Sequence, residues 1–145
     1  MVKNHNLIKQ YSRTSLSNTP PFFVLMDTNF IYFTLKNKID IFSAMLTCFS
    51  GKTILCVSTC VISELEKLGS KFRLALKCVK DSRIQKISCV HPPNIIYADD
   101  CIYETSKIFQ NFFVATCDKG LKMRIKKISS IPIVGIKKKK FVLST

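Results

Sequence analysis

The chain has 145 residues, a length that predicts a single domain with a hydrophobic core of its own. Hydrophobic residues make up 47% of the sequence, which excludes a disordered chain, and no apolar run reaches the roughly 18 residues that a membrane span needs. The 23 Lys and Arg residues against 9 Asp and Glu give a net charge of +14. Because such an excess repels itself unless a polyanion neutralises it, nucleic acid is the first expected partner, with an acidic membrane surface or protein as the alternatives.

Short apolar runs predict the strands of a sheet. A flexible basic arm is expected over residues 1–19, followed by a folded domain over residues 20–145. Within that domain, buried strands are predicted over residues 22–26, 53–58, 112–116 and 131–136, with shorter strands near 84–88 and 141–143.

Helical spacing of apolar residues fills the segments between these strands. Two helices are expected between residues 31 and 49, with a break near residues 36–38. The helix that follows strand 53–58 has Thr59 as its predicted N-cap and Gly69 as its predicted stop. Further helices are predicted over residues 71–80, 98–109 and 119–127. Strands that alternate with helices indicate an α/β fold with a mainly parallel central sheet.

The few acidic residues fall at special places in this pattern. Asp27 directly follows strand 22–26, Asp118 lies just past strand 112–116, Glu64 lies early in the helix after strand 53–58, and Asp99 and Asp100 open a helix. Strand C-termini and helix N-termini share one edge of a parallel sheet, so these carboxylates are expected to meet there. Carboxylates in close proximity repel unless a cation binds between them, which predicts a Mg²⁺ or Mn²⁺ site able to hydrolyse a phosphodiester.

Two points stay open at this stage. Acids in the first turn of a helix also serve as caps and partners of the helix dipole, and that explanation competes with catalysis for Glu64, Asp99 and Asp100. Helical geometry places Asp99 on the side of Ile102 and Asp100 toward Tyr103, which favours Asp99 as the primary ligand and Asp100 as an accessory one.

Several motifs in fixed order resemble the PIN-domain nuclease family. They are VLMDTNFI, CVISELEKLG, YADDC and VATCDKGLKMRIKKI. Together with KFRLALK, DSRI and the Cys-x-His element, these motifs resemble more specifically the endoribonuclease branch that processes rRNA in the eukaryotic small-subunit processome. The resemblance runs from about residue 20 to about residue 135.

This resemblance implies a three-layer α/β/α PIN-like fold and a Mg²⁺- or Mn²⁺-dependent endoribonuclease. The family acts on precursor rRNA in the nucleolus of the nucleus, together with processome proteins and a snoRNA. Its acidic positions carry over to Asp27, Glu64, Asp118 and either Asp99 or Asp100, where the family register favours Asp100. Asn29 and Thr116 match polar positions beside the metal. The alternatives are a non-cleaving PIN scaffold that binds RNA in the same assembly and a toxin-like PIN ribonuclease.

A second candidate metal site uses soft ligands. Cys60, Cys89, His91 and Cys101 form a Cys₃His set, a common complement for structural zinc, and a related processome PIN protein has zinc ligands that resemble them. Zinc would pin the segment 89–101 to the helix that carries Glu64. The alternative is a group of buried thiols beside one surface histidine.

Basic residues form two groups that favour contact with the RNA backbone, although each is also consistent with a solvated face. The aromatic residues follow the apolar pattern and do not indicate base stacking. The run Lys137–Lys140 is consistent with a nuclear signal, an RNA contact or a soluble edge strand. The two groups comprise Lys67, Lys71, Arg73, Lys77, Lys80, Arg83 and Lys86, and Lys119, Lys122, Arg124, Lys126 and Lys127.

Overall fold

A single sheet runs through the computed structural model of the chain, which describes residues 20–144 apart from 90, 96 and 110. The predicted arm over residues 1–19 lies outside the described residues. The strands are β1 (Phe22–Met26), β2 (Thr53–Ser58), β3 (Gln85–Ile87), β4 (Phe113–Ala115), β5 (Ile133–Lys137) and β6 (Lys140–Ser144).

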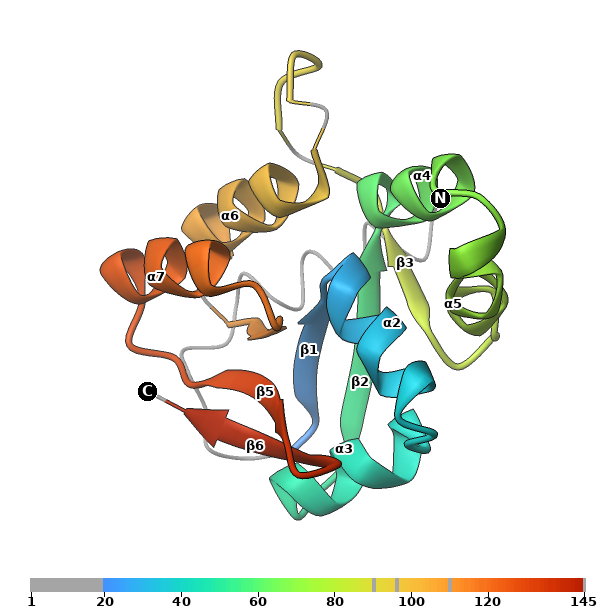
Figure 1. The fold of residues 1–145 in the computed structure, drawn as a ribbon. Coiled ribbons are helices and arrows are strands. Elements are labelled where there is room, and N and C mark those ends of the chain that lie inside the picture. Colours follow the sequence, from blue (N-terminus) through green and yellow to red (C-terminus); the bar gives the residue numbers. More distant parts are fainter. Residues whose placement is uncertain (1–19, 90, 96, 110, 145) are drawn as a thin grey trace.

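The described strands lie in the order β3-β2-β1-β4-β5-β6. All neighbours are parallel except β5 and β6, which form an antiparallel hairpin. The chain starts at the central strand β1, proceeds outward through β2 to β3, and then returns to the other side of β1 at β4 (Figure 1). The order of strands therefore reverses beside β1, and in parallel sheets this is the point where ligands bind, outside the carboxyl ends of the strands.

Helices connect the parallel strands. They are α2 (Thr28–Lys36), α3 (Ile41–Phe49), α4 (Thr59–Lys67), α5 (Arg73–Val79), α6 (Ala98–Ile108) and α7 (Lys119–Ile128), with a 3₁₀ turn, η1 (Ser70–Phe72), before α5. Right-handed crossovers place α2 to α5 on one face of the sheet and α6 and α7 on the other, because the chain travels in opposite directions in the two halves. In Figure 1, α6 lies beside α7 and α4 lies beside α5. The predicted three-layer α/β/α fold is confirmed.

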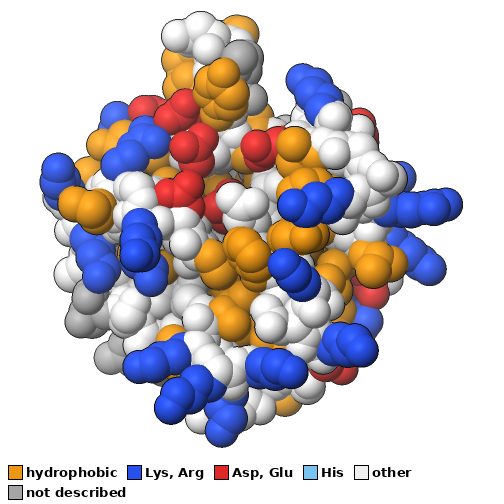
Figure 2. All heavy atoms as spheres, in the orientation of Figure 1, with side chains coloured by type: hydrophobic (Ala, Val, Ile, Leu, Met, Phe, Trp, Pro, Cys, Tyr) orange, Lys and Arg blue, Asp and Glu red, His pale blue; other side chains and the backbone are white. Residues whose placement is uncertain are grey.

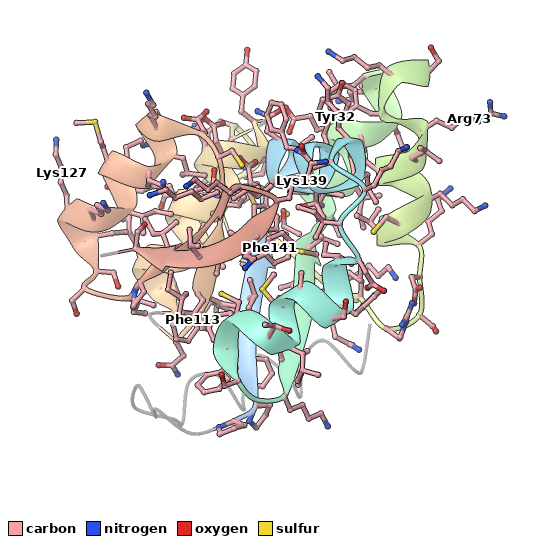
Figure 3. All side chains as sticks on the ribbon, turned by 60° about the horizontal axis from the view of Figure 1, so that its bottom comes forward. Tyr32, Arg73, Phe113, Lys127, Lys139 and Phe141 are labelled. Atoms are coloured by element: carbon pink, nitrogen blue, oxygen red, sulfur yellow. The ribbon has the colours of Figure 1, made fainter. Side chains whose placement is uncertain are left out.

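The core lies between the sheet and these helices. Val24, Leu25 and Met26 of β1 are fully buried, as expected for a central parallel strand covered on both faces. Phe30 of α2 packs on Phe141 of β6 with ring centroids 4.9 Å apart, and Figure 3 shows Phe141 between the hairpin and α3. The last strand is thereby fixed to the first helix.

Two local predictions need correction, and a third is confirmed. The N-cap of α4 is Ser58 rather than Thr59, since the Ser58 hydroxyl accepts from the backbone N–H of Val61. The helix expected over 71–80 begins as a 3₁₀ turn, and its α-helical part covers only Arg73–Val79. Gly69, with φ of 81°, follows the end of α4 as predicted.

The lysine run forms the turn of the β5–β6 hairpin. Lys138 and Lys139 have φ of 51° and 60°, the left-handed values that a tight two-residue hairpin turn requires. Only Lys137 and Lys140 belong to strands, so the run is a solvent-facing turn at the end of the edge hairpin rather than an edge strand, and the nuclear signal and the RNA contact stay predictions. Within the described part of the chain, none of the helices combines the length and the apolar character needed to cross a membrane.

Candidate active site

A pocket of about 170 Å³ opens at the carboxyl edge of the sheet, where the strand order reverses. Four of its six lining residues are acidic, and they come from the segments after β1 and β4, from the second turn of α4 and from the first turn of α6. Figure 2 shows these acidic side chains gathered at one place on a surface that is otherwise dotted with Lys and Arg. The lining consists of Asp27, Thr28, Asn29, Glu64, Asp99 and Asp118.

Asp27 lies at the base of the pocket and is 4% exposed. It caps α2 by accepting from the backbone N–H of Thr28 at 2.8 Å, and its other oxygen accepts from the Thr116 hydroxyl at 3.0 Å. Burial raises the pKa of Asp27 to about 6, with a further increase from Glu64 and Asp118, although the two hydrogen bonds oppose it. The carboxylate is thus held in one orientation in a place where its charge is poorly solvated.

Glu64 is held by a residue from another segment. The Thr28 hydroxyl donates to Glu64 Oε2 at 2.7 Å, so the first turn of α2 positions the carboxylate of α4. Thr28 is 3% exposed and lines the pocket itself. It was missed in the sequence because a threonine after an N-cap carries no chemical signal until its partner across the fold is known.

Thr116 organises the opposite side. Its hydroxyl donates to Asp27 and accepts from the backbone N–H of Asp118 at 3.0 Å, and its side chain is fully buried. Asp118 in turn caps α7 by accepting from the backbone N–H of Leu121 at 3.0 Å. A single buried hydroxyl therefore sets the spacing between the two carboxylates that follow β1 and β4.

Asp99 and Asp100 have different surroundings. Asp99 lines the pocket, whereas Asp100 does not and instead accepts from Arg124 Nη1 of α7 at 2.9 Å. Arg124 lies 3.9 Å from Asp99 and rests on the ring of Tyr103, with its guanidinium carbon 4.3 Å from the ring centroid. Among the described groups, Arg124 is thus the cation beside the acidic cluster, and the sequence assigned it only to a general basic group.

The donor set suits a hard divalent cation. The pocket offers carboxylates, a hydroxyl and an amide, all of them oxygen-bearing groups, and its lining contains no thiol or imidazole among the described residues. Mg²⁺ and Mn²⁺ prefer such ligands and retain several water molecules. Repulsion between the close carboxylates, together with burial, disfavours the charged form of Asp27 and raises its pKa. A bound cation would remove this repulsion and stabilise the charged form.

The pKa of Asp27 leads to a prediction about stability. The folded protein holds this proton up to about pH 6 against an ordinary value of 3.8, so the free energy of unfolding falls as the pH rises from about 4 to about 6 and stays low above it. The difference corresponds to at most about 3 kcal/mol. In buffer without Mg²⁺ or Mn²⁺, Asp27→Asn is expected to be more stable than the unmodified chain by about 1–3 kcal/mol at pH 7.5 and nearly equal to it at pH 4. Urea unfolding of both proteins across this range measures the difference, and a gap that does not vary with pH contradicts the prediction.

Behind the acidic pocket, the structure brings Cys60, Cys89, His91 and Cys101 together. The four ligand atoms all lie within 4.8 Å of one another. The Sγ atom of Cys89 lies 3.3 Å from that of Cys60 and 3.5 Å from that of Cys101, and Cys60 Sγ lies 3.2 Å from His91 Nε2. Tetrahedral zinc with bonds of about 2.3 Å to sulfur separates its ligands by roughly 3.8 Å, which is close to this arrangement.

The pKa values of the three thiols in this cluster are shifted in different directions. Hydrogen bonds, the largest from Cys101, lower the pKa of Cys89 to about 4, whereas burial first of all raises the pKa of Cys60 to about 11. The pKa of Cys101 is raised as well, because its thiol donates to Cys89. Nδ1 of His91 donates to the Pro92 carbonyl at 2.9 Å, which leaves the Nε2 lone pair facing Cys60.

The chain is similar to known proteins in both sequence and fold. A family model described as Fcf1 matches residues 47–145. The rRNA-processing protein fcf1 of Schizosaccharomyces pombe is 47% identical over 131 residues, covering 90% of this chain and 66% of that protein. The rRNA-processing protein FCF1 of Saccharomyces cerevisiae is 45% identical over 117 residues, covering 81% of this chain and 61% of that protein. The chain thus spans less than two thirds of the length of either relative.

Among solved structures, one described as that of the PIN domain endonuclease Utp24 is similar with a TM-score of 0.83. It is 46% identical, and the match covers 88% of this chain and 95% of the solved one. The predicted family resemblance is therefore confirmed at the level of both sequence and fold.

Proposed function

The chain belongs to the Fcf1 family, and on that premise we propose that it is a divalent-metal-dependent endoribonuclease that cleaves precursor rRNA during maturation of the small ribosomal subunit. Relatives named as rRNA-processing proteins support the RNA substrate, and a neighbour named as a PIN domain endonuclease supports the reaction. The observation that carries the proposal is the convergence of four carboxylates from four segments in one pocket of a chain with a net charge of +14.

Each residue of the pocket has a role in this proposal. Asp27, Glu64, Asp99 and Asp118 would hold Mg²⁺ or Mn²⁺, with Asn29 as an accessory group at the rim. Thr28 and Thr116 orient Glu64 and Asp27 through the hydrogen bonds described above. When bound, the ion supplies Lewis acidity toward a phosphodiester oxygen and lowers the pKa of water.

The basic surface would hold the RNA backbone beside the pocket. Some members of the two predicted groups already have partners. Arg83 donates to Asp81 through Nε and Nη2 and rests on the ring of Phe42, and Lys86 donates to two backbone carbonyls. The exposed members that remain for phosphate contact include Lys67, Lys71, Arg73, Lys77 and Lys80 of the first group.

We also propose that Cys60, Cys89, His91 and Cys101 bind a structural zinc. Cys60 lies one helical turn before Glu64 on α4, and Cys101 lies two residues after Asp99 on α6. A zinc here would tie the starts of α4 and α6 together, and thereby fix the relative positions of two carboxylates of the acidic pocket. The partners would be processome proteins, snoRNA and precursor rRNA, and the location the nucleolus.

Cleavage by the purified chain tests the proposed function. Incubated with single-stranded precursor rRNA, the chain is expected to cut it in Mn²⁺ or Mg²⁺ and to leave it intact in EDTA, as followed on a denaturing gel. A chain that binds this RNA but never cuts it, even when reconstituted with its assembly, supports instead a non-cleaving scaffold with the same fold.

A further inference from the structure

Beside the acidic pocket, three aromatic side chains form a cluster at the surface. Tyr32 of α2 packs against Phe72 of η1 with ring centroids 4.7 Å apart and against Phe33 at 5.4 Å. Phe33 is 38% exposed, and Leu74 at the margin is 68% exposed. Apolar side chains that gather at a surface in this way mark a place where another molecule binds.

Two lysines accompany the aromatic cluster. Lys71 Nζ lies 5.1 Å from the centroid of the Tyr32 ring, and Lys36 Nζ lies 5.9 Å from it. Together with Leu35, Leu74 and Ala75, these residues line a groove of about 160 Å³ between α2 and α5, and no carboxylate is among the residues that line it. An aromatic ring flanked by cations suits a ligand in which a flat ring lies next to an anionic group.

The groove and the acidic pocket are both lined by residues of α2. One side of α2 carries Asn29, then Tyr32 or Phe33, and then Lys36, at the spacing of successive helical turns. Asn29 also lines the acidic pocket. The rise of the helix puts Tyr32 about 5 Å and Lys36 about 10 Å beyond Asn29 along its axis. In Figure 2, hydrophobic side chains lie next to the acids, over α2 and toward α5, with Lys and Arg among them, and Figure 3 shows Tyr32 on the side of α2 near the helices α4 and α5.

We propose that this groove is a nucleotide subsite, in which Tyr32 stacks on an unpaired base of single-stranded RNA and Lys36 and Lys71 contact the neighbouring phosphates. Stacking on aromatic rings beside a cationic path is how proteins bind single strands without reading their sequence. The charge of the lining favours RNA over an apolar protein segment. Because Tyr32 lies about one helical turn beyond Asn29 of the acidic pocket, a base stacked on it would lie near the phosphodiester to be cut. The subsite rests on the proposed function for its role, but it predicts RNA binding by itself.

Binding without catalysis tests the subsite. In buffer without Mg²⁺ or Mn²⁺, so that no cleavage occurs and the zinc is not stripped, the affinity of the chain for a fluorescently labelled single-stranded oligoribonucleotide is measured by anisotropy at several salt concentrations. Tyr32→Leu, which keeps an apolar side chain but removes the ring, is expected to weaken binding about tenfold, whereas Tyr32→Phe retains the affinity. Lys71→Ala is expected to reduce the slope of affinity against salt by about one.

Two matched variants serve as controls. Leu46→Ala removes an exposed apolar side chain of α3, which is 52% exposed, and Lys52→Ala removes an exposed lysine at the opposite end of β2 from the acids. Both are expected to bind like the unmodified chain. A duplex of the same sequence should show no dependence on the ring of Tyr32, because its bases are already stacked.

The outcomes separate the subsite from the nuclease proposal. If Tyr32→Leu binds the single strand as tightly as Tyr32→Phe, the subsite is wrong even when the unmodified chain cleaves RNA. If the Tyr32 effect is found but no cleavage occurs in Mn²⁺, the subsite stands and the proposed activity fails. If the loss is equal for duplex and single strand, the ring is not stacking on an unpaired base and the proposal is overturned.

Discussion

Asp99→Asn is expected to reduce metal-dependent cleavage of single-stranded RNA by at least about 100-fold, whereas Asp100→Asn retains most of the activity. Asp99 lines the acidic pocket, and Asp100 is bound to Arg124 outside it. Removal of a group that only supports a metal ligand lowers metal affinity or activity roughly 10- to 100-fold. Loss of a ligand itself is expected to lower activity by at least the upper end of that range. Asp27→Asn, which removes the most buried carboxylate, should be at least as severe.

The two neighbouring aspartates provide a matched comparison. Both substitutions remove one negative charge from the first turn of α6, so their general effects on charge and on the helix dipole are nearly equal. Initial rates at several Mn²⁺ concentrations distinguish a weakened metal site from a lost one, since extra Mn²⁺ rescues only the former. If Asp100→Asn is inactive while Asp99→Asn is active, then the register suggested by the family resemblance is right and the pocket lining is a poor guide to the ligands.

Removal of zinc is expected to have the largest effect on stability. The purified chain should contain one zinc per molecule, and Cys60→Ser or Cys101→Ser should lower the free energy of unfolding by more than about 4 kcal/mol, as loss of a structural metal does in other proteins. The physical reason is that Cys60 and Cys101 come from α4 and α6, and zinc bonds would replace the weak thiol contacts that these residues make with Cys89 and His91.

Other cysteines of the chain provide the control for this prediction. Cys48 and Cys78 are half-buried against the core, outside the cluster, and burial raises the pKa of both thiols. Cys48→Ser and Cys78→Ser are therefore expected to retain zinc and to lose no more than about 2 kcal/mol. Elemental analysis gives the zinc content, and thermal unfolding with and without a strong chelator gives the stability. A folded chain that is free of zinc and melts at the same temperature with chelator contradicts the structural zinc.

Hydrophobic patterning was sufficient to predict the arrangement of the main elements. Uninterrupted apolar runs such as residues 22–26 and 53–58 predict strands that are buried on both faces. Because helices are predicted between these strands, each connection crosses over a face of the sheet, and the connected strands are parallel. Once the sheet is parallel, Asp27 and Asp118 must lie at the same edge, because Asp27 directly follows one strand and Asp118 lies just past another. The four acidic candidates were therefore predicted to converge from local sequence alone, and the pocket brings them together.

What the sequence by itself determined was the sheet, its carboxyl edge and the acids that lie on it, because period and position along a strand depend only on neighbouring residues. Tertiary packing decided which of Asp99 and Asp100 enters the pocket, since α7 has to place Arg124 against one of them. It also decided the contacts between segments distant in sequence, namely Thr28 with Glu64 and Tyr32 with Phe72. Such contacts leave no periodic signal, because the two partners acquire a common role only when separate elements pack side by side.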